Sequence, residues 1–176
     1  WRLPEPDSFD RQTADKAMEI LDETMDRADY IYDLAREGIK CLVNMLVKRE
    51  DLAVSAGTRR PVEGSEHVFA ECAKSIAGRP LPGGPTLCLG VILMTELQGR
   101  SSRPVKQFLK WVQVPWDPES AGLSAHELKQ ALTGLFDFAA QHGFKKTVIN
   151  SAEISEEAAD KLISAMREPL LKSSLM

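Results

Sequence analysis

Two parallel heptad stripes run from residue 14 to residue 46, and they are the most regular feature of this sequence. Successive members of each stripe are separated alternately by four and three positions, which on an α-helix places them along one line of its surface. The apolar stripe consists of Ala14, Met18, Leu21, Met25, Ala28, Tyr32, Ala35, Ile39, Leu42 and Leu46. The acidic stripe consists of Asp15, Glu19, Asp22, Asp26, Asp29 and Asp33. The pattern predicts one long helix from about residue 9 to residue 48.

The second half of this predicted helix differs from the first. Between Ile39 and Val47, apolar side chains cover nearly all of its sides, and a helix that is apolar all round is expected to be buried. Gly38 is its weakest point, although the heptad phase continues through it. We therefore expect residues 1–48 to form an acidic, heptad-patterned helix. Residues 49–176 are expected to form a compact helical body that folds as one unit with the second half of that helix.

The remaining sequence contains further helix signals. Ser124 and Glu127 form a capping-box pattern, and Ser155 precedes another acidic helix start. The buried segment 86–97 fits a helix or a strand, and residues 145–150 fit a short strand. With 43% hydrophobic residues, the composition is that of a folded domain. The expected fold is mainly α: a long N-terminal helix packed on a compact multi-helix bundle, with at most a minor short strand element.

The apolar seam is the part of the apolar stripe in the first half of the helix. It consists of Ala14, Met18, Leu21, Met25, Ala28, Tyr32 and Ala35. Later helices of the same chain could cover it. It could instead pack between chains as a coiled coil, because the stripe extends beyond four heptads. The sequence leaves both interpretations open.

The acidic ridge consists of the six members of the acidic stripe. Residues 1–37 hold eleven acidic and five basic side chains, whereas the rest of the chain has a small excess of bases. Like charges four positions apart destabilise a helix slightly. The ridge is either a solvated helix face or a surface that meets a basic partner.

The basic face comprises Arg100, Arg103, Lys106, Lys110 and Trp111, in a stretch from 98 to 116 that has no acidic residue. Its amphipathic pattern is compatible with nucleic acid, an anionic membrane or an acidic partner. It is also compatible with an ordinary surface helix whose lysine stems lie along the protein.

Several classes of site find no support in the sequence. Cys41, Cys72 and Cys88 form no disulfide framework, which favours an intracellular, reducing compartment, cytoplasmic or nuclear. There is no P-loop, no dinucleotide glycine motif and no zinc-ligand spacing, so no cofactor and no metal is expected. No signal peptide or membrane span is expected, and Trp1 suggests a fragment of a longer protein.

A metal-dependent alternative comes from paired carboxylates. Glu19 with Asp22 and Glu23 with Asp26 have E-x-x-D spacing, and Glu153 with Glu156 could face them. Helical carboxylates grouped in this way can hold magnesium for phosphate chemistry. The spacing resembles that of the all-α nucleotide pyrophosphohydrolases, which would imply a divalent-metal-dependent phosphohydrolase.

The sequence-based hypothesis is a non-catalytic helical assembly or adaptor protein. It would self-associate or dock another protein through the apolar seam and the acidic ridge, with the basic face meeting nucleic acid, membrane or an acidic partner. By analogy, a viral structural or nucleocapsid-associated protein would fit. No catalytic residue is assigned under this hypothesis, and the phosphohydrolase is the alternative.

Overall fold

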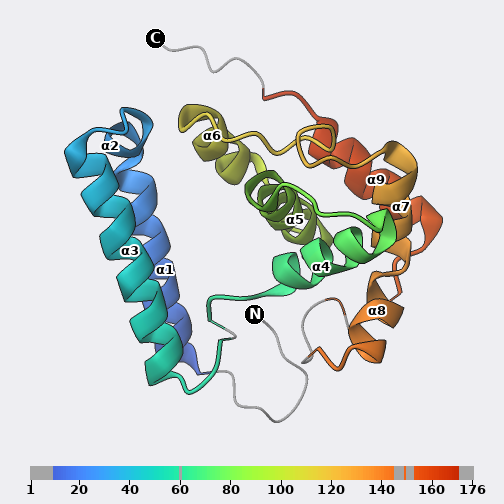
Figure 1. Ribbon diagram of the computed structural model, residues 1–176, viewed down its shortest axis with the longest axis horizontal. Coiled ribbons are helices and arrows are strands. Elements are labelled where there is room, and N and C mark those ends of the chain that lie inside the picture. Colours follow the sequence, from blue (N-terminus) through green and yellow to red (C-terminus); the bar gives the residue numbers. More distant parts are fainter. Residues whose placement is uncertain (1–9, 60, 145–148, 150–152, 171–176) are drawn as a thin grey trace. The chain divides into compact units, whose positions relative to one another are not determined.

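A computed structural model describes residues 10–59, 61–144, 149 and 153–170. The expectation of a mainly α fold is confirmed, because these residues form nine helices and no strand (Figure 1). They group into two compact units, the first from residues 1–64 with 111–113 and the second from residues 65–110 with 114–176. This grouping does not test the predicted division at residues 48 and 49, which stays a prediction. None of the helices described is long and apolar enough to cross a membrane.

The single helix expected over residues 9–48 is wrong. The chain instead forms α1 (Arg11–Asp26), the short α2 (Ala28–Tyr32) and α3 (Arg36–Ser55). Helices α1 and α3 lie side by side as a hairpin (Figure 1), and Glu23 of α1 pairs with Lys48 of α3. A folded hairpin buries apolar surface within one chain, which a solitary helix of forty residues cannot do.

The reversal occurs at Leu34, whose φ of 47° lies in the left-handed region. Gly38, in the first turn of α3, then lies directly against the backbone of α2. A Cβ atom at this position would come 1.8 Å from the Tyr30 carbonyl oxygen. Glycine at position 38 therefore allows a close approach of two helices, rather than weakening one long helix.

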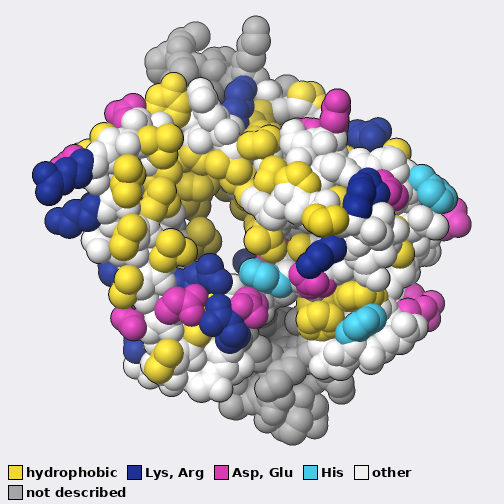
Figure 2. Space-filling view, viewed as in Figure 1, with side chains coloured by type: hydrophobic (Ala, Val, Ile, Leu, Met, Phe, Trp, Pro, Cys, Tyr) yellow, Lys and Arg dark blue, Asp and Glu magenta, His cyan; other side chains and the backbone are white. Residues whose placement is uncertain are grey.

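The expected burial of the second half of the long helix is also wrong in detail. Cys41 and Met45 are buried on one face of α3, but Leu42 is only half-buried. Val43 and Leu46 remain 52% and 55% exposed, and apolar side chains are visible along the surface of the hairpin (Figure 2). Two packed helices cover only one face of each other, so the opposite face of α3 stays open.

The second unit contains the main core. Helix α4 (Ser65–Ala77) packs against α5 (Gly83–Leu97), α7 (Ala125–Thr133) and α8 (Leu135–Gln141), while α5 and α7 both contact α9 (Glu156–Arg167). Segment 86–97 is therefore helical. The largest fully buried side chains of this core are Phe69, Leu89, Ile92, Leu93, Leu128, Leu132, Leu135 and Ile149.

Helix ends in the second unit follow the predicted capping signals. The Ser124 hydroxyl accepts from the Glu127 backbone N–H, and the Glu127 carboxylate accepts from the Ser124 N–H at 2.8 Å. Ser155 caps α9 by accepting from the Ala158 N–H. The strand expected over 145–150 lies outside the described residues, apart from Ile149.

Candidate functional site

A groove of about 760 Å³ lies in the second unit. It lies between α6 (Arg103–Trp111), the loop that follows α6 and the end of α9. Its volume is in the range of small-molecule sites, on the order of 300–1,000 Å³. The lining combines the apolar side chains Trp116, Leu123 and Met166 with charged ones at its edges. The charged members are Lys106, Lys110, Asp117, Glu119, Arg167 and Glu168.

Lys106 is the most unusual of these charged residues, because it is only 4% exposed. Its ammonium Nζ donates a hydrogen bond to the Ala165 carbonyl oxygen at 2.7 Å. Ala165 lies in the last turn of α9, where its carbonyl oxygen accepts a long hydrogen bond of 3.3 Å from the Glu168 N–H and where a positive charge is favoured. Burial lowers the pKa of Lys106, and the nearby carboxylates of Glu96 and Glu168 oppose that shift. Lys106 therefore ties α6 to the end of α9.

The carboxylate of Asp117 is held within its own loop. It accepts hydrogen bonds from the Ser120 backbone N–H at 2.8 Å and from the Ser120 hydroxyl at 2.7 Å. These bonds lower the pKa of Asp117. The side chain therefore shapes the loop that forms one wall of the groove.

The structure separates the members of the predicted basic face. Arg100, Arg103 and Lys110 are exposed and Trp111 is 59% exposed, whereas Lys106 is buried. Lys106 shares a face with Leu109, since both are buried and lie three positions apart on α6. The predicted basic face is therefore not one solvent-facing surface, because Lys106 is buried. Only Lys106 and Lys110 of the predicted set line the groove.

All six residues of the acidic ridge are exposed. The apolar seam is only partly covered. Met18 and Leu21 are about half exposed, whereas Ala14, Met25 and Ala28 are partly buried. The use of either surface by a partner stays a prediction.

Two of the paired carboxylates of the phosphohydrolase alternative form ion pairs with cations of the protein. Glu23 pairs with Arg27 and Lys48, and Glu156 pairs with Lys129 at 3.3 Å. In the part of the chain that the structure describes, no three His, Cys, Asp or Glu side chains are grouped so that they could hold a metal ion. Glu23 and Glu156 therefore link neighbouring helices.

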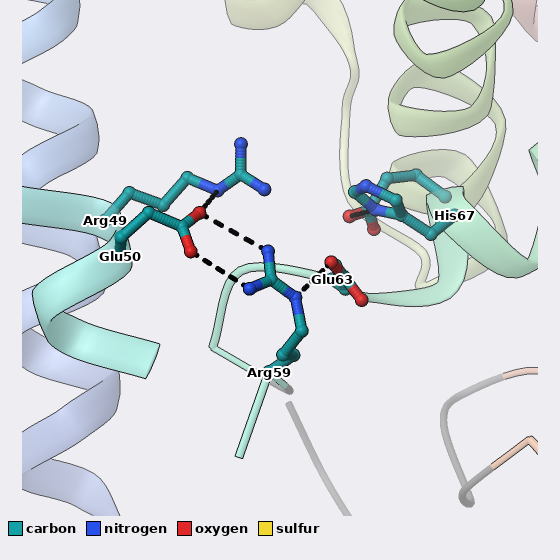
Figure 3. Close-up of polar contacts among 6 residues, drawn as sticks. Arg49, Glu50, Arg59, Glu63 and His67 are labelled. Atoms are coloured by element: carbon teal, nitrogen blue, oxygen red, sulfur yellow. Dashed lines mark hydrogen bonds and ion pairs between the residues drawn. The ribbon is translucent and has the colours of Figure 1, made fainter. Parts of the chain in front are cut away.

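In the first unit, Arg59 pairs with the carboxylates of Glu50 and Glu63, an arrangement that we call the Arg59 clamp (Figure 3). The Arg59 guanidinium donates two hydrogen bonds to Glu50, at 2.9 and 3.3 Å, and pairs through Nε with Glu63. Arg59 lowers the pKa of Glu50. Because Glu50 belongs to α3, the clamp ties the loop after α3 back to that helix. On α4, separately, His67 Nδ1 lies 2.9 Å from the Glu66 carboxylate.

A second clamp, around Arg79, organises one end of the second unit. Arg79 donates to the Glu127 carboxylate, to the Ala77 carbonyl oxygen at 2.9 Å and to the Gly122 carbonyl oxygen at 2.7 Å. These bonds, together with the capping box, lower the pKa of Glu127 to about 2. The clamp links the end of α4 to the beginning of α7.

The groove and both clamps were missed by the sequence interpretation. Arg167 and Lys110 are far apart in the sequence, and so are Arg79 and Glu127. Of these contacts, only the pairing of Arg59 with Glu63 could have been predicted from the sequence, from its i,i+4 spacing. The remaining contacts require tertiary packing.

The chain is similar to several archaeal dehydrogenases. It is 33% identical over 142 residues to a protein of Korarchaeum cryptofilum named glycerol-1-phosphate dehydrogenase [NAD(P)+], covering 78% of this chain and 44% of that protein. Proteins of the same name from Hyperthermus butylicus and Methanobrevibacter smithii are 27% and 28% identical over 165 and 166 residues, each covering 92% of this chain. The chain spans less than half the length of these relatives, 46% and 47% for the latter two. No family model matches the sequence.

These relatives overturn the sequence-based hypotheses of function. Their names describe NAD(P)-linked oxidoreductases, so the expectation of a non-enzyme is wrong. The assembly or adaptor protein, its viral and nucleic-acid-binding associations and the alternative phosphohydrolase are wrong for the same reason. Helix periodicity indicated the mainly α class, but it carries no information on redox chemistry. The comparisons thus relate this chain to part of the length of proteins named glycerol-1-phosphate dehydrogenase.

Proposed function

We propose that this chain is the helical part of an NAD(P)-linked oxidoreductase that acts on glycerol 1-phosphate or a closely similar alcohol. The observation that carries the proposal is the 33% identity over 142 residues with a protein of that name. Proteins of the same name from other archaea align with up to 92% of the chain. The similarity therefore extends over most of the two helical units.

The residues of this chain do not themselves fit the dinucleotide. NAD(P)+ binding of the common type needs a strand, a glycine-rich turn and a helix whose N-terminus meets the pyrophosphate. The sequence has no such glycine motif, and the structure shows no strand among the residues it describes. We therefore assign no contact with NAD(P) to these helices and propose that they supply the helical framework of the enzyme.

The test is a dehydrogenase assay of the protein that carries this sequence. We expect NAD(P)H to form when that protein is incubated with glycerol 1-phosphate and either NAD+ or NADP+, and to be followed by its absorbance. Glycerol, which lacks the phosphate, is the control substrate and should react much more slowly. No NAD(P)H formation with glycerol 1-phosphate, and no NAD(P)H consumption with the corresponding keto phosphate, would overturn the proposal.

We further propose that the protein resides in a reducing compartment. Cys41 and Cys72 are buried and unpaired, and Cys88 is partly buried and unpaired. Burial raises the pKa of Cys72 to about 11 and also raises that of Cys88. A thiol with a raised pKa forms little thiolate at neutral pH, and the thiolate is the reactive form. Such cysteines are therefore oxidised slowly. Thiol titration of protein trapped in cell extracts should find all three thiols reduced.

A further inference from the structure

The chain leaves α9 along the wall of the groove between α6, the loop after α6 and the end of α9. Helix α9 ends at Arg167, and Glu168 has φ −53° and ψ 125°, an extended conformation that is favoured before Pro169. Glu168, Pro169 and Leu170 all line the groove. Residue 171 therefore continues from a non-helical segment that already borders it.

The floor of the groove is apolar. Leu123 and Met166 are buried at the floor, and Trp116 and Leu170 are partly buried along the walls. An apolar groove of this kind is stabilised by further apolar side chains, because their burial removes hydrocarbon surface from water.

The charges around this floor are balanced, with three cations and three carboxylates in the lining. Asp117 is already bonded to Ser120, whereas Lys110, Glu119 and Arg167 form no ion pair with any residue that the structure describes. A peptide backbone offers C=O groups to cations and N–H groups to carboxylates. A peptide segment therefore suits this lining better than a ligand that carries charge of one sign.

Residues 171–176 have a composition that matches the groove. Leu171, Leu175 and Met176 are large and apolar, and Lys172 is the one charged side chain among the six. In an extended chain, Leu171 and Leu175 would share one side, because side chains alternate. A segment tethered to the wall of its own site also needs little intrinsic affinity, since a short link gives an effective concentration on the order of millimolar.

We propose that residues 171–176 bind in this groove, with Leu171 and Leu175 against Trp116 and with Lys172 paired with the Glu119 carboxylate. Lys110 and Arg167 donate to carbonyl oxygens of the bound segment. The segment thereby closes the groove to ligands from solution. The proposal does not rest on the dehydrogenase activity, because no groove residue has been assigned to that reaction.

Trp116 reports on the segment when Trp1→Phe and Trp111→Phe leave it as the single tryptophan of this sequence. Deletion of residues 171–176 should raise the acrylamide quenching constant of Trp116 at least about twofold, because it removes apolar cover from the ring. Circular dichroism should show unchanged helix content, since α9 ends before the deletion. An unchanged quenching constant would overturn the proposal.

Two matched double variants of the full chain separate the apolar contacts from the mere presence of the segment. Leu171→Ser with Leu175→Ser should raise the quenching of Trp116 as much as the deletion does. Ser173→Ala with Ser174→Ala changes the same number of residues but keeps the apolar ones, and the quenching should not change. Equal effects of the two pairs would contradict the proposed contact of the leucines with Trp116.

A synthetic peptide of residues 171–176 tests the site directly, with Trp116 fluorescence as the signal. We expect saturable binding to the protein that lacks these residues, at millimolar peptide or below. Binding to the full chain should be at least about fivefold weaker, because the tethered segment competes. Equal binding to both proteins, or no binding at millimolar peptide to the shortened protein, would overturn the proposal.

A charge exchange tests the pairing of Lys172 with Glu119. Glu119→Lys in the shortened protein should weaken binding of the peptide about threefold to fivefold, and a peptide with Lys172→Glu should restore it. Asp137→Lys makes the same charge change at an exposed position outside the groove, and it should alter the affinity by no more than about twofold. Failure of the exchanged peptide to bind better than the original one would overturn this pairing, whatever the dehydrogenase assay shows.

Discussion

At the scale of single residues, the most constrained position is Gly38. The backbone of α2 lies so close that a Cβ atom would overlap the Tyr30 carbonyl oxygen at 1.8 Å. The neighbouring atoms belong to the backbone, and so they cannot move aside as a flexible side chain can. Gly83, at the beginning of α5, offers a contrast, because nothing lies within 4 Å of its potential Cβ atom.

Gly38→Ala should therefore destabilise the hairpin by about 1–3 kcal/mol or more, as overpacking does elsewhere. Gly83→Ala is the matched control and should change the free energy of unfolding by no more than about 0.5 kcal/mol. Urea denaturation followed by circular dichroism measures both. A neutral Gly38→Ala variant would contradict the close contact between α2 and α3.

Glu127 gives a residue-scale prediction about pH. Its pKa is about 2 in the folded protein, chiefly because of Arg79, and about 4.3 in an unfolded chain. A carboxyl group with a lowered folded pKa contributes stability above the unfolded pKa and loses it as the pH falls through the folded value. The stabilising effect of Glu127 should therefore fade between about pH 5 and pH 2.

Glu127→Gln removes this titration while it retains the shape of the side chain. We expect the variant to melt below the wild-type protein at neutral pH, and the difference in Tm to shrink as the pH falls towards 2. Glu157→Gln, in an exposed pair with Lys161, serves as the control and should show little change. A constant difference in Tm across this range would indicate that the Arg79 clamp does not form.

At the scale of secondary-structure elements, α3 and α5 both carry many apolar residues but differ in how many of them are buried. Helix α5 is surrounded by neighbours, and its Leu93 is fully buried. Helix α3 is packed mainly on one side, and its Leu46 is 55% exposed. Composition suggests burial for both, so the difference depends on the number of helices that pack around each one.

Leu93→Ala should cost about 2–5 kcal/mol, because it removes buried methyl groups and leaves a cavity. Leu46→Ala makes the same chemical change at an open position and should cost about 0.5 kcal/mol or less. Thermal and urea unfolding of both variants would check this difference. Similar losses in the two variants would show that the exposed face of α3 is covered in solution.

At the scale of the whole molecule, the proposed function rests on the similarity to named relatives and not on the periodicity of the sequence. The heptad stripes pointed to assembly, whereas the archaeal relatives are named as dehydrogenases. An amphipathic helix is used alike in enzymes and in assembly proteins, so its periodicity cannot distinguish them. The charged residues selected from the sequence were chosen by local spacing. The cations that line the groove come from two separate helices, and only Lys106 and Lys110 belonged to the selected set.

The sequence by itself determined the helical class and several helix ends. Apolar periodicity and capping at Ser124 and Ser155 depend on residues within a few positions of one another, so they are readable locally. Tertiary structure alone decided the reversal at Leu34, the burial of Lys106 and the Arg79–Glu127 clamp. The heptad phase of this sequence continues unchanged through the hairpin, so it did not reveal the reversal at Leu34. The energy of a buried charge such as Lys106 depends on partners that are distant in the sequence. Such features require the packed helices to be present together.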